Sequence, residues 1–270
     1  MAGVLLGAPQ PWYKPRVSEP SPPTLELRGV SKNFGSVQAL QEVDFEVRDG
    51  EVMALVGDNG AGKSTLIKCV AGINSIDGGE ILFDGKAVSI HGPKDAAKLG
   101  IEVVYQDLAL CDNLDVVQNM FLGREVHSPL FRLKEAPMEQ RTAETLRSLS
   151  VTTISSIHQP VASLSGGQRQ SVAVARAVLW NSRVVILDEP TAALGVAQTR
   201  QVLDLVKRLA EQGLGVVIVS HNLIDVFEVA DRITVLRLGR NAGVYEREKT
   251  TQQEIVSAIT FGIPGRETAA

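Results

Sequence analysis

The sequence is poor in cysteine and in aromatic residues, and it lacks a long apolar segment. Its 270 residues include two cysteines, Cys69 and Cys111, which cannot build a disulfide framework or a four-cysteine metal site. We therefore expect free thiols, a reducing compartment and no zinc-type fold. The longest apolar stretches, such as residues 184–187 and 215–219, are far shorter than the ~20 residues that cross a bilayer. Because the N-terminus also lacks the basic start of a secretory signal, the chain is predicted to be soluble and cytosolic.

Basic residues are slightly fewer than acidic ones. Lys and Arg number 27 and Asp and Glu 31, which gives a net charge of −4. A wide basic surface is therefore not expected, and we predict no nucleic-acid partner. Six of the twelve prolines precede residue 24, so residues 1–23 are predicted to form a flexible, proline-rich tail. Trp12 and Tyr13 in this tail either anchor a partner or are incidental.

Two kinds of apolar pattern follow the tail. Residues 25–28 and 43–47 alternate between apolar and polar, which predicts antiparallel strands with one solvated face. Runs without alternation, typical of parallel strands buried on both faces, occupy residues 52–56, 184–187 and 216–219. Helical patterns lie between them, at residues 63–71, 167–179 and 196–211, so the core is predicted to be α/β. Residues 90–165 are mostly helical in pattern and predict a helical insertion.

A glycine-rich stretch, residues 57–65, fits the pattern G-x-x-x-x-G-K-[ST] between a predicted buried strand and a predicted helix. Glycines let backbone N–H groups approach phosphate oxygens, and the helix N-terminus adds partial positive charge. We expect Lys63 to contact the terminal phosphates of a nucleotide and Ser64 to ligate Mg²⁺. The predicted nucleotide-binding residues are Gly57, Asp58, Asn59, Gly60, Ala61, Gly62, Lys63, Ser64 and Thr65.

Two carboxylates end the second buried run. Asp188 follows residues 184–187 directly, and we expect it to hold Mg²⁺ through the water shell of the ion. Glu189 is then the candidate that orients or deprotonates the attacking water in nucleotide hydrolysis. An Asp-Glu-Pro triplet alone also fits an ordinary turn, and the glycine-rich loop is what favours the catalytic interpretation.

A third motif comprises Leu164, Ser165, Gly166, Gly167 and Gln168, followed by Arg169 and Gln170. It matches the signature sequence of ATP-binding-cassette (ABC) ATPases, which the chain resembles over residues 25–248. A flexible linker or a helix cap is the alternative, but it leaves the Gln-Arg-Gln run unexplained. The resemblance implies a P-loop NTPase core with a parallel sheet, an N-terminal antiparallel β subdomain and an inserted helical subdomain. It also implies a head-to-tail homodimer, in which the signature of one chain covers the ATP of the other.

Other family positions can be matched residue by residue. Phe34 resembles the aromatic residue that stacks on adenine, although a core phenylalanine in a strand is a serious alternative. Gln106 resembles the glutamine that touches Mg²⁺ and the attacking water, and His221 resembles the switch histidine that contacts the γ-phosphate. Gly195 departs from the family, which commonly has an aspartate there that helps to couple the two sites. That coupling contact is therefore in doubt.

The resemblance implies an ATP-hydrolysing subunit that energises import through a separate permease, with ATP and Mg²⁺ as cofactors. Segments such as residues 119–125 and 221–232 resemble single-cassette monosaccharide importers of the ribose and fructose type. The implied partners are a second copy, transmembrane permease subunits and a periplasmic or lipoprotein sugar-binding protein, at the cytoplasmic face of the plasma membrane. The alternatives are a non-sugar importer, a regulatory cassette, and a soluble ABC ATPase acting on DNA or ribosomes. We divide the chain into the tail, a cassette over residues 24–248, and a C-terminal extension, residues 249–270, with one short possible helix at 252–261.

Overall fold

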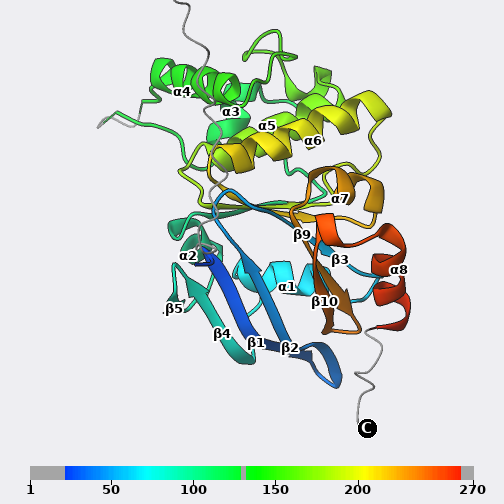
Figure 1. Cartoon of the computed structure of the whole chain (residues 1–270). Coiled ribbons are helices and arrows are strands. Elements are labelled where there is room, and N and C mark those ends of the chain that lie inside the picture. The colour runs from blue at the N-terminus through cyan, green and yellow to red at the C-terminus, as the bar shows by residue number, and fades with distance from the viewer. Residues whose placement is uncertain (1–21, 129–131, 263–270) are drawn as a thin grey trace, which may run out of the picture.

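The structure is a computed structural model that describes residues 22–128 and 132–262. The predicted tail lies outside these residues except for Pro22 and Pro23. Within them, two sheets and a group of helices form successive layers (Figure 1).

A six-stranded sheet is the centre of the fold. Its strand order is β10-β9-β3-β8-β7-β6, and all neighbours are parallel except β10 and β9. In β3, Val52, Ala54 and Val56 pack with the helices, while Met53 and Leu55 pack toward the second sheet. The predicted parallel strands with two buried faces are therefore confirmed. The strands are β3 (Val52–Val56), β6 (Ile101–Val104), β7 (Val184–Asp188), β8 (Gly215–Val219), β9 (Arg232–Arg237) and β10 (Arg240–Glu246).

The second sheet is antiparallel, as predicted, with the order β2-β1-β4-β5. In β1, Leu25 and Leu27 are buried and Arg28 is exposed, which is the alternation that a one-sided sheet requires. Helix α1 (Lys63–Val70) lies between the two sheets and shares one core with both. The strands are β1 (Leu25–Phe34), β2 (Val37–Val47), β4 (Gly78–Phe83) and β5 (Lys86–Val88).

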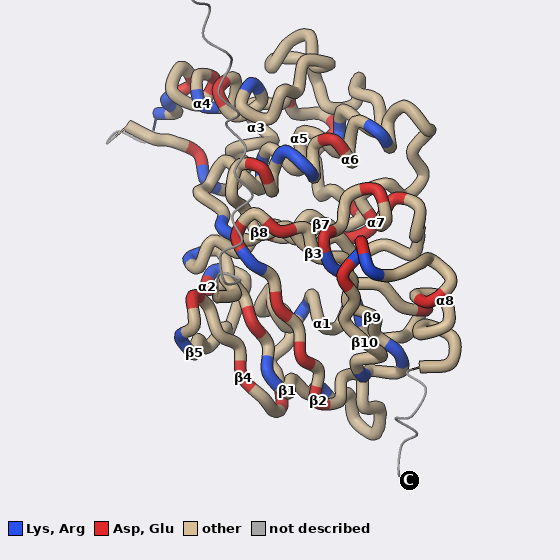
Figure 2. The backbone as a smooth tube through the Cα atoms, in the orientation of Figure 1, with Lys and Arg blue, Asp and Glu red and all other residues tan. Residues whose placement is uncertain are grey.

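Arg183, next to the start of β7, ties the two sheets together. Its guanidinium lies 2.9 Å from the Asp49 carboxylate, which follows β2, and 3.2 Å from that of Asp84, which follows β4. Charged residues of both signs are interspersed along the strands and helices (Figure 2). Pairs like these are partly exposed, so each stabilises the fold only slightly.

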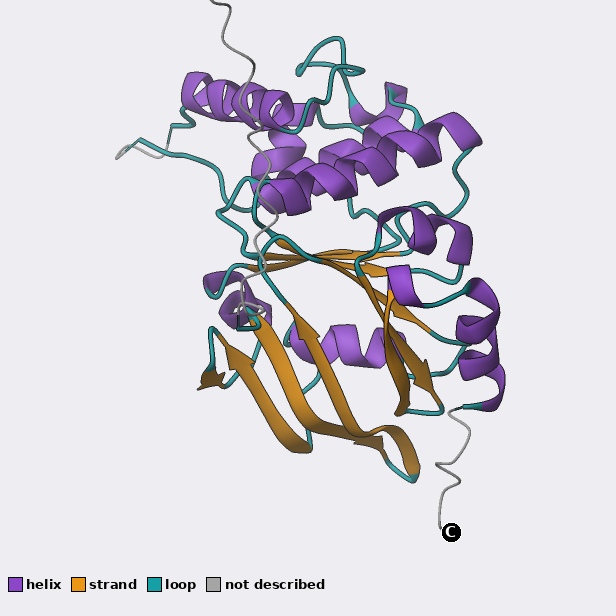
Figure 3. Ribbon diagram, viewed as in Figure 1, coloured by secondary structure: helices purple, strands orange, loops and turns teal. Residues whose placement is uncertain are grey.

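Helices cover the other face of the six-stranded sheet (Figure 3). Helix α6 has the predicted bounds, and α5 begins one residue before the predicted start. Helix α2 (Pro93–Lys98) packs on β6, and β6 belongs to the six-stranded sheet, so the grouped helices begin at α3. The domain boundaries themselves stay a prediction. The covering helices are α3 (Val116–Phe121), α4 (Glu135–Ser148), α5 (Gly166–Val178), α6 (Val196–Glu211) and α7 (Leu223–Val229), with a 3-10 turn at Val161–Ser163.

The predicted C-terminal helix is confirmed as α8 (Gln252–Phe261), which follows a 3-10 turn at Arg247–Lys249. It begins with a capping box between Thr251 and Glu254 and packs against β9 and β10. Ile255 and Ala258 are buried there, so this helix belongs to the main core. None of the helices within 22–128 and 132–262 is both long and apolar enough for a membrane span.

Candidate nucleotide site

The glycine-rich loop joins β3 to α1, as predicted. Gly57 has φ +154°, and a Cβ atom built on it would lie 2.3 Å from the carbonyl oxygen of Leu236 in β9. No side chain fits at that distance, so the tight approach of the loop to β9 depends on glycine at this position.

Lys63, the first residue of α1, is almost fully buried beneath this loop. Its Nζ donates hydrogen bonds to the carbonyl oxygens of Gly57 at 2.7 Å and Asp58 at 3.0 Å. An ammonium group has three donors, so one remains for an anion. Burial lowers the pKa of Lys63, whereas the nearby charges of Glu189, Asp58 and Asp188 oppose that shift.

A pocket of about 510 Å³ opens beside the loop. One wall is the start of β2, and another is the turn between β9 and β10 at Leu238 and Gly239. Most of the predicted nucleotide-binding residues line it, namely Asn59, Gly60, Ala61, Gly62, Lys63, Ser64 and Thr65. Gly57 and Asp58 are the residues whose carbonyls hold Lys63.

Phe34 ends β1, three residues before the strand that lines the pocket. It is 48% exposed, and the Lys32 Nζ lies 5.6 Å from the centre of its ring. The alternative of a core phenylalanine is therefore wrong, because the ring is open to solvent. Stacking on a nucleotide base stays a prediction.

Asp188, Glu189 and His221 come together where β7 and β8 end. The Glu189 backbone N–H donates to the Val219 carbonyl at 2.9 Å, and Glu189 has φ +50°, a left-handed conformation that is unusual for this residue type. His221 Nδ1 lies 2.9 Å from Glu189 Oε2. The histidine side chain is 73% exposed, whereas that of Glu189 is only 17% exposed. Burial and the charge of Glu189 raise the pKa of Asp188, and Lys63 partly offsets this.

These residues fit a magnesium ion that takes most of its ligands from phosphate and water. Ser64 is the second residue of α1 and Asp188 is the last residue of β7, so both offer the oxygen ligands that Mg²⁺ prefers. Among the described residues, no cluster of three or more His, Cys, Asp or Glu side chains could hold a metal alone. Gln106 follows β6, which pairs in parallel with β7. Gln106 therefore lies at the same end of the parallel strands as Asp188, and its side chain is exposed. Its contact with the ion stays a prediction.

The predicted signature residues form the N-terminus of α5. Leu164 is buried, and Ser165 Oγ accepts a hydrogen bond from the Gln168 N–H at 3.3 Å. Gln168 Oε1 in turn accepts from the Ser165 N–H at 2.8 Å, which completes a capping box. The helix-cap alternative is thus real and accounts for Gln168, and it leaves the first N–H groups of α5 open to an anion. Helices α1 and α5 lie on opposite faces of the six-stranded sheet (Figure 1), so the signature cannot cover the glycine-rich loop of its own chain.

Comparison with known proteins decides the family. A family model described as ABC transporter matches residues 40–192. The chain belongs to the ABC transporter family. The xylose/arabinose import ATP-binding protein of Sulfolobus acidocaldarius is 49% identical over 236 residues, which cover 87% of this chain and 93% of that protein. The fructose import ATP-binding protein of Rhizobium meliloti is 48% identical over 244 residues, which cover 88% and 94%.

Solved structures agree with this assignment. A dimeric ATP-binding cassette in a post-hydrolysis state with bound ADP and Pi has a TM-score of 0.68 at 25% identity, and the match covers 83% of this chain and 98% of that one. The predicted family, fold and ATPase class are therefore confirmed.

The loop after Pro190 contacts the signature within the same cassette. Gly195 caps α6, and its N–H donates to Gln198 Oε1 at 3.2 Å. A Cβ atom on Gly166 would lie 2.9 Å from the Leu194 side chain, and one on Gly167 would lie 3.1 Å from Gln198 Cβ. Sequence reasoning identified Gly195 but missed Gln198, because a glycine cap has no side chain to complete the Ser/Thr-x-x-Glu/Gln pattern of a capping box.

Thr191 and Asp225 were also not predicted to belong to the site. The Thr191 hydroxyl donates to Asp225 Oδ2 at 2.6 Å, and both side chains are buried. The bond joins the turn after Glu189 to α7, which begins two residues after His221. It therefore fixes the two ends of the Glu189–His221 contact relative to one another.

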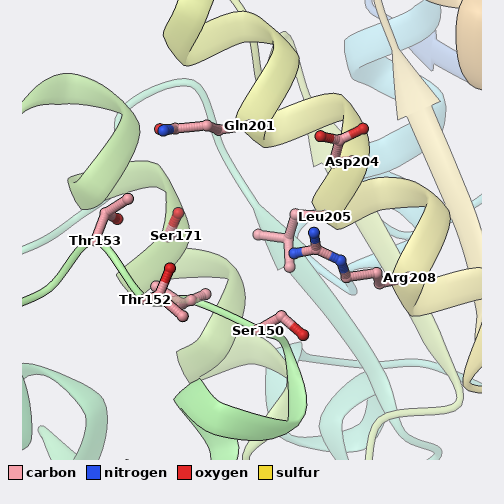
Figure 4. Close-up of a pocket in the computed structure, with 9 residues that line it drawn as sticks. Ser150, Thr152, Thr153, Ser171, Gln201, Asp204, Leu205 and Arg208 are labelled. Carbon is pink, nitrogen blue, oxygen red and sulfur yellow. The ribbon is translucent and has the colours of Figure 1, made fainter.

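A second, smaller pocket of about 150 Å³ lies away from the glycine-rich loop (Figure 4). Gln201, Asp204 and Arg208 of α6 line it opposite Thr152, Thr153 and Ser171. None of the predicted site residues of the cassette lines this pocket.

Proposed function

We propose that the chain is the ATP-hydrolysing subunit of an ABC importer whose cargo is a monosaccharide. ATP hydrolysis is supported by one observation. Four functional side chains lie close together around the end of β7, namely Lys63, Asp188, Glu189 and His221. Sugar cargo is supported by the similarity of this chain to the xylose/arabinose and fructose import ATP-binding proteins, which extends over nearly their whole length.

Each residue at this site has a separable task. The free donor of Lys63 binds the terminal phosphates, while its other two donors hold the loop in shape. Ser64 and Asp188 would hold Mg²⁺, which when bound neutralises phosphate charge. His221 Nδ1 lies 2.9 Å from Oε2 of Glu189, and Oε1 is then the oxygen that accepts a hydrogen bond from the attacking water.

A second copy of the chain completes the site in this proposal. The opposite placement of α1 and α5 supports a head-to-tail dimer, in which each ATP lies between the loop of one chain and the signature of the other. Two composite sites would form per dimer, and the similar dimeric cassette supports that arrangement.

We further propose that permease subunits and a sugar-binding protein complete the transporter, with the cassette at the cytoplasmic face of the membrane. Transport requires a channel, and the described helices include none suited to span a bilayer. The test is co-purification from detergent-solubilised membranes, followed by reconstitution in vesicles with xylose, arabinose, ribose or fructose. ATPase stimulation by one of these sugars supports the proposal, whereas stimulation only by a non-sugar solute contradicts it.

Hydrolysis is tested with Glu189→Gln. Removing the base should lower kcat at least about a hundredfold while ATP binding is retained, because general-base catalysis supplies rate enhancements of that size. The variant should also form an ATP-dependent dimer in size-exclusion chromatography. Glu248→Gln is the matched control, since that side chain is 81% exposed and, within residues 22–128 and 132–262, forms an ion pair with Arg247 alone. Unchanged turnover in Glu189→Gln would remove Glu189 from the mechanism.

A further inference from the structure

Two arginines of α5 hold the segment that follows Gln106. Arg176 donates from Nη2 to the Leu108 carbonyl and from Nη1 to the Ala109 carbonyl, each at 2.9 Å. Ala109 has φ +48°, a left-handed conformation that is unfavourable for alanine and needs outside support. The forked guanidinium therefore fixes two consecutive carbonyls of the Gln106 segment (residues 106–112).

The position of the Arg176 guanidinium is unfavourable unless these two hydrogen bonds form. Arg176 is partly buried, and burial lowers the pKa of its guanidinium, whereas the charge of Glu102 opposes that shift from beyond ion-pair distance. A partly buried charge that makes no direct ion pair loses hydration, and the hydrogen bonds to the two carbonyls compensate for that loss. The attachment to the Gln106 segment is thus the interaction that the position of Arg176 serves.

Arg169 makes a second attachment two turns earlier on the same helix. Its Nη1 lies 2.8 Å from Asp112 Oδ1, its Nη2 donates to the Ala162 carbonyl at 3.3 Å, and its Nε donates to the Leu164 carbonyl at 3.4 Å. The Ala162 N–H also donates to the Asp112 carbonyl at 3.0 Å. The end of the Gln106 segment is therefore bonded directly to Ala162, two residues before the signature, and through Arg169 to Leu164 of the signature itself.

A fully buried asparagine holds both the end of this segment and the chain just beyond it. Asn119 accepts from the Cys111 N–H at 2.7 Å and donates to the Cys111, Leu114 and Asp115 carbonyls. The loop between the Gln106 segment and α3 is thereby fixed to the helical layer. A displacement of Gln106 must therefore displace the helices as well, because this loop cannot change shape on its own.

From these contacts we infer that Arg169 and Arg176 are positioning residues that make the Gln106 segment and the signature move as one body. The inference rests on the proposed ATP-sandwich dimer. Gln106 then faces the ATP of its own chain, whereas the signature covers the ATP of the partner. Nucleotide at one site would shift the signature at the other, so this arginine pair transmits cooperativity between the two ATP sites.

Cys111 provides a built-in reporter for the attachment. It is partly buried within the Gln106 segment, whereas Cys69 lies in the core, where burial raises the pKa of its thiol to about 11. Maleimide labelling near neutral pH therefore reports on Cys111, and Cys111→Ser confirms the source of the signal. We expect Arg176→Met to label about tenfold faster, because a lost charge-assisted hydrogen bond shifts an equilibrium by at least that factor.

The same variant separates coupling from binding. In Arg176→Met the Hill coefficient for ATP hydrolysis should fall from its wild-type value, which for two sites is at most about two, toward one. The Kd for ATP should stay within about twofold, since the glycine-rich loop is untouched. Arg208→Met is the matched control. Arg208 also donates to a backbone carbonyl, that of Leu149, but it lines the separate pocket shown in Figure 4 and not the Gln106 segment. It should leave labelling and cooperativity unchanged.

Two further variants keep the test decisive if Arg176→Met does not fold. Arg176→Lys keeps the positive charge but loses the second hydrogen bond of the guanidinium, and Asp112→Ala removes the carboxylate that pairs with Arg169. Both variants should therefore show a smaller rise in labelling rate and a smaller fall in the Hill coefficient than Arg176→Met. Wild-type labelling rates and Hill coefficients in these variants would overturn the inference, as would a Hill coefficient of one in the unmodified chain. An unmodified chain that hydrolyses no ATP would instead refute the proposed function.

Discussion

Replacing Gly57 with alanine should damage the fold before any nucleotide is added. The new Cβ would lie 2.3 Å from the Leu236 carbonyl oxygen, which belongs to the neighbouring strand β9, so the loop or the strand must move. Strain at the left-handed backbone costs about 1–2 kcal/mol, and overpacking adds about 1–3 kcal/mol. We expect the free energy of unfolding to fall by about 3 kcal/mol, the sum of typical values of these two costs.

Gly60→Ala supplies the matched control within the same loop. Gly60 also has positive φ, at +79°, but no atom lies within 4 Å of its Cβ position. Its substitution should therefore cost only the strain, about 1 kcal/mol. Urea unfolding without nucleotide measures both, with the fluorescence of Trp180, which packs edge-to-face on Phe121, as the signal. Equal losses in the two variants would refute the steric account of Gly57.

Three other outcomes follow from the site. Lys63→Met should abolish detectable ATP binding in calorimetry, because it removes the buried ammonium; micromolar binding by the variant would contradict the role of Lys63. Phe34→Ala should weaken ATP binding about tenfold through lost base stacking, with Phe34→Trp close to wild type; equal affinity of all three proteins would remove Phe34 from the site. Asp188→Asn should stabilise the nucleotide-free fold at neutral pH. The raised pKa of Asp188 means that its contribution to stability is fully present below the ordinary value of 3.8 and is lost as pH rises through the raised value. Thermal melts across this range should therefore show a smaller loss with rising pH in Asp188→Asn than in wild type, and parallel curves would contradict the shift.

The bounds of segments with a regular apolar pattern could be predicted from the sequence. Where the pattern is interrupted, the predicted strand is shorter than the strand in the structure. Helix α6 has the predicted bounds because its apolar positions recur regularly along sixteen residues. Strand β1 runs six residues beyond the predicted 25–28, because a register shift after Leu27, beside the left-handed Gly29, breaks the alternation that identifies a strand. Strand β2 was similarly recognised only after Glu42, another left-handed residue.

The site divides in the same way. Lys63, Ser64 and Asp188 lie next to the strands and helices that position them, so local motifs were enough to find them. Arg176 was not found, because its partners are the carbonyls of Leu108 and Ala109, 68 and 67 positions away in the sequence. The exposure of Phe34 could not be predicted from a local pattern either, since it depends on what packs against the end of β1.

The left-handed backbone of Glu189 has a consequence for how this chain can evolve. Glycine or asparagine would relax that conformation, by about 1 kcal/mol for glycine. A laboratory selection that rewards heat tolerance alone would therefore drift toward an inert cassette that still folds, binds nucleotide and dimerises. Retaining a glutamate at φ +50° requires continued demand for turnover. Heat tolerance and turnover thus make opposing demands on this one position.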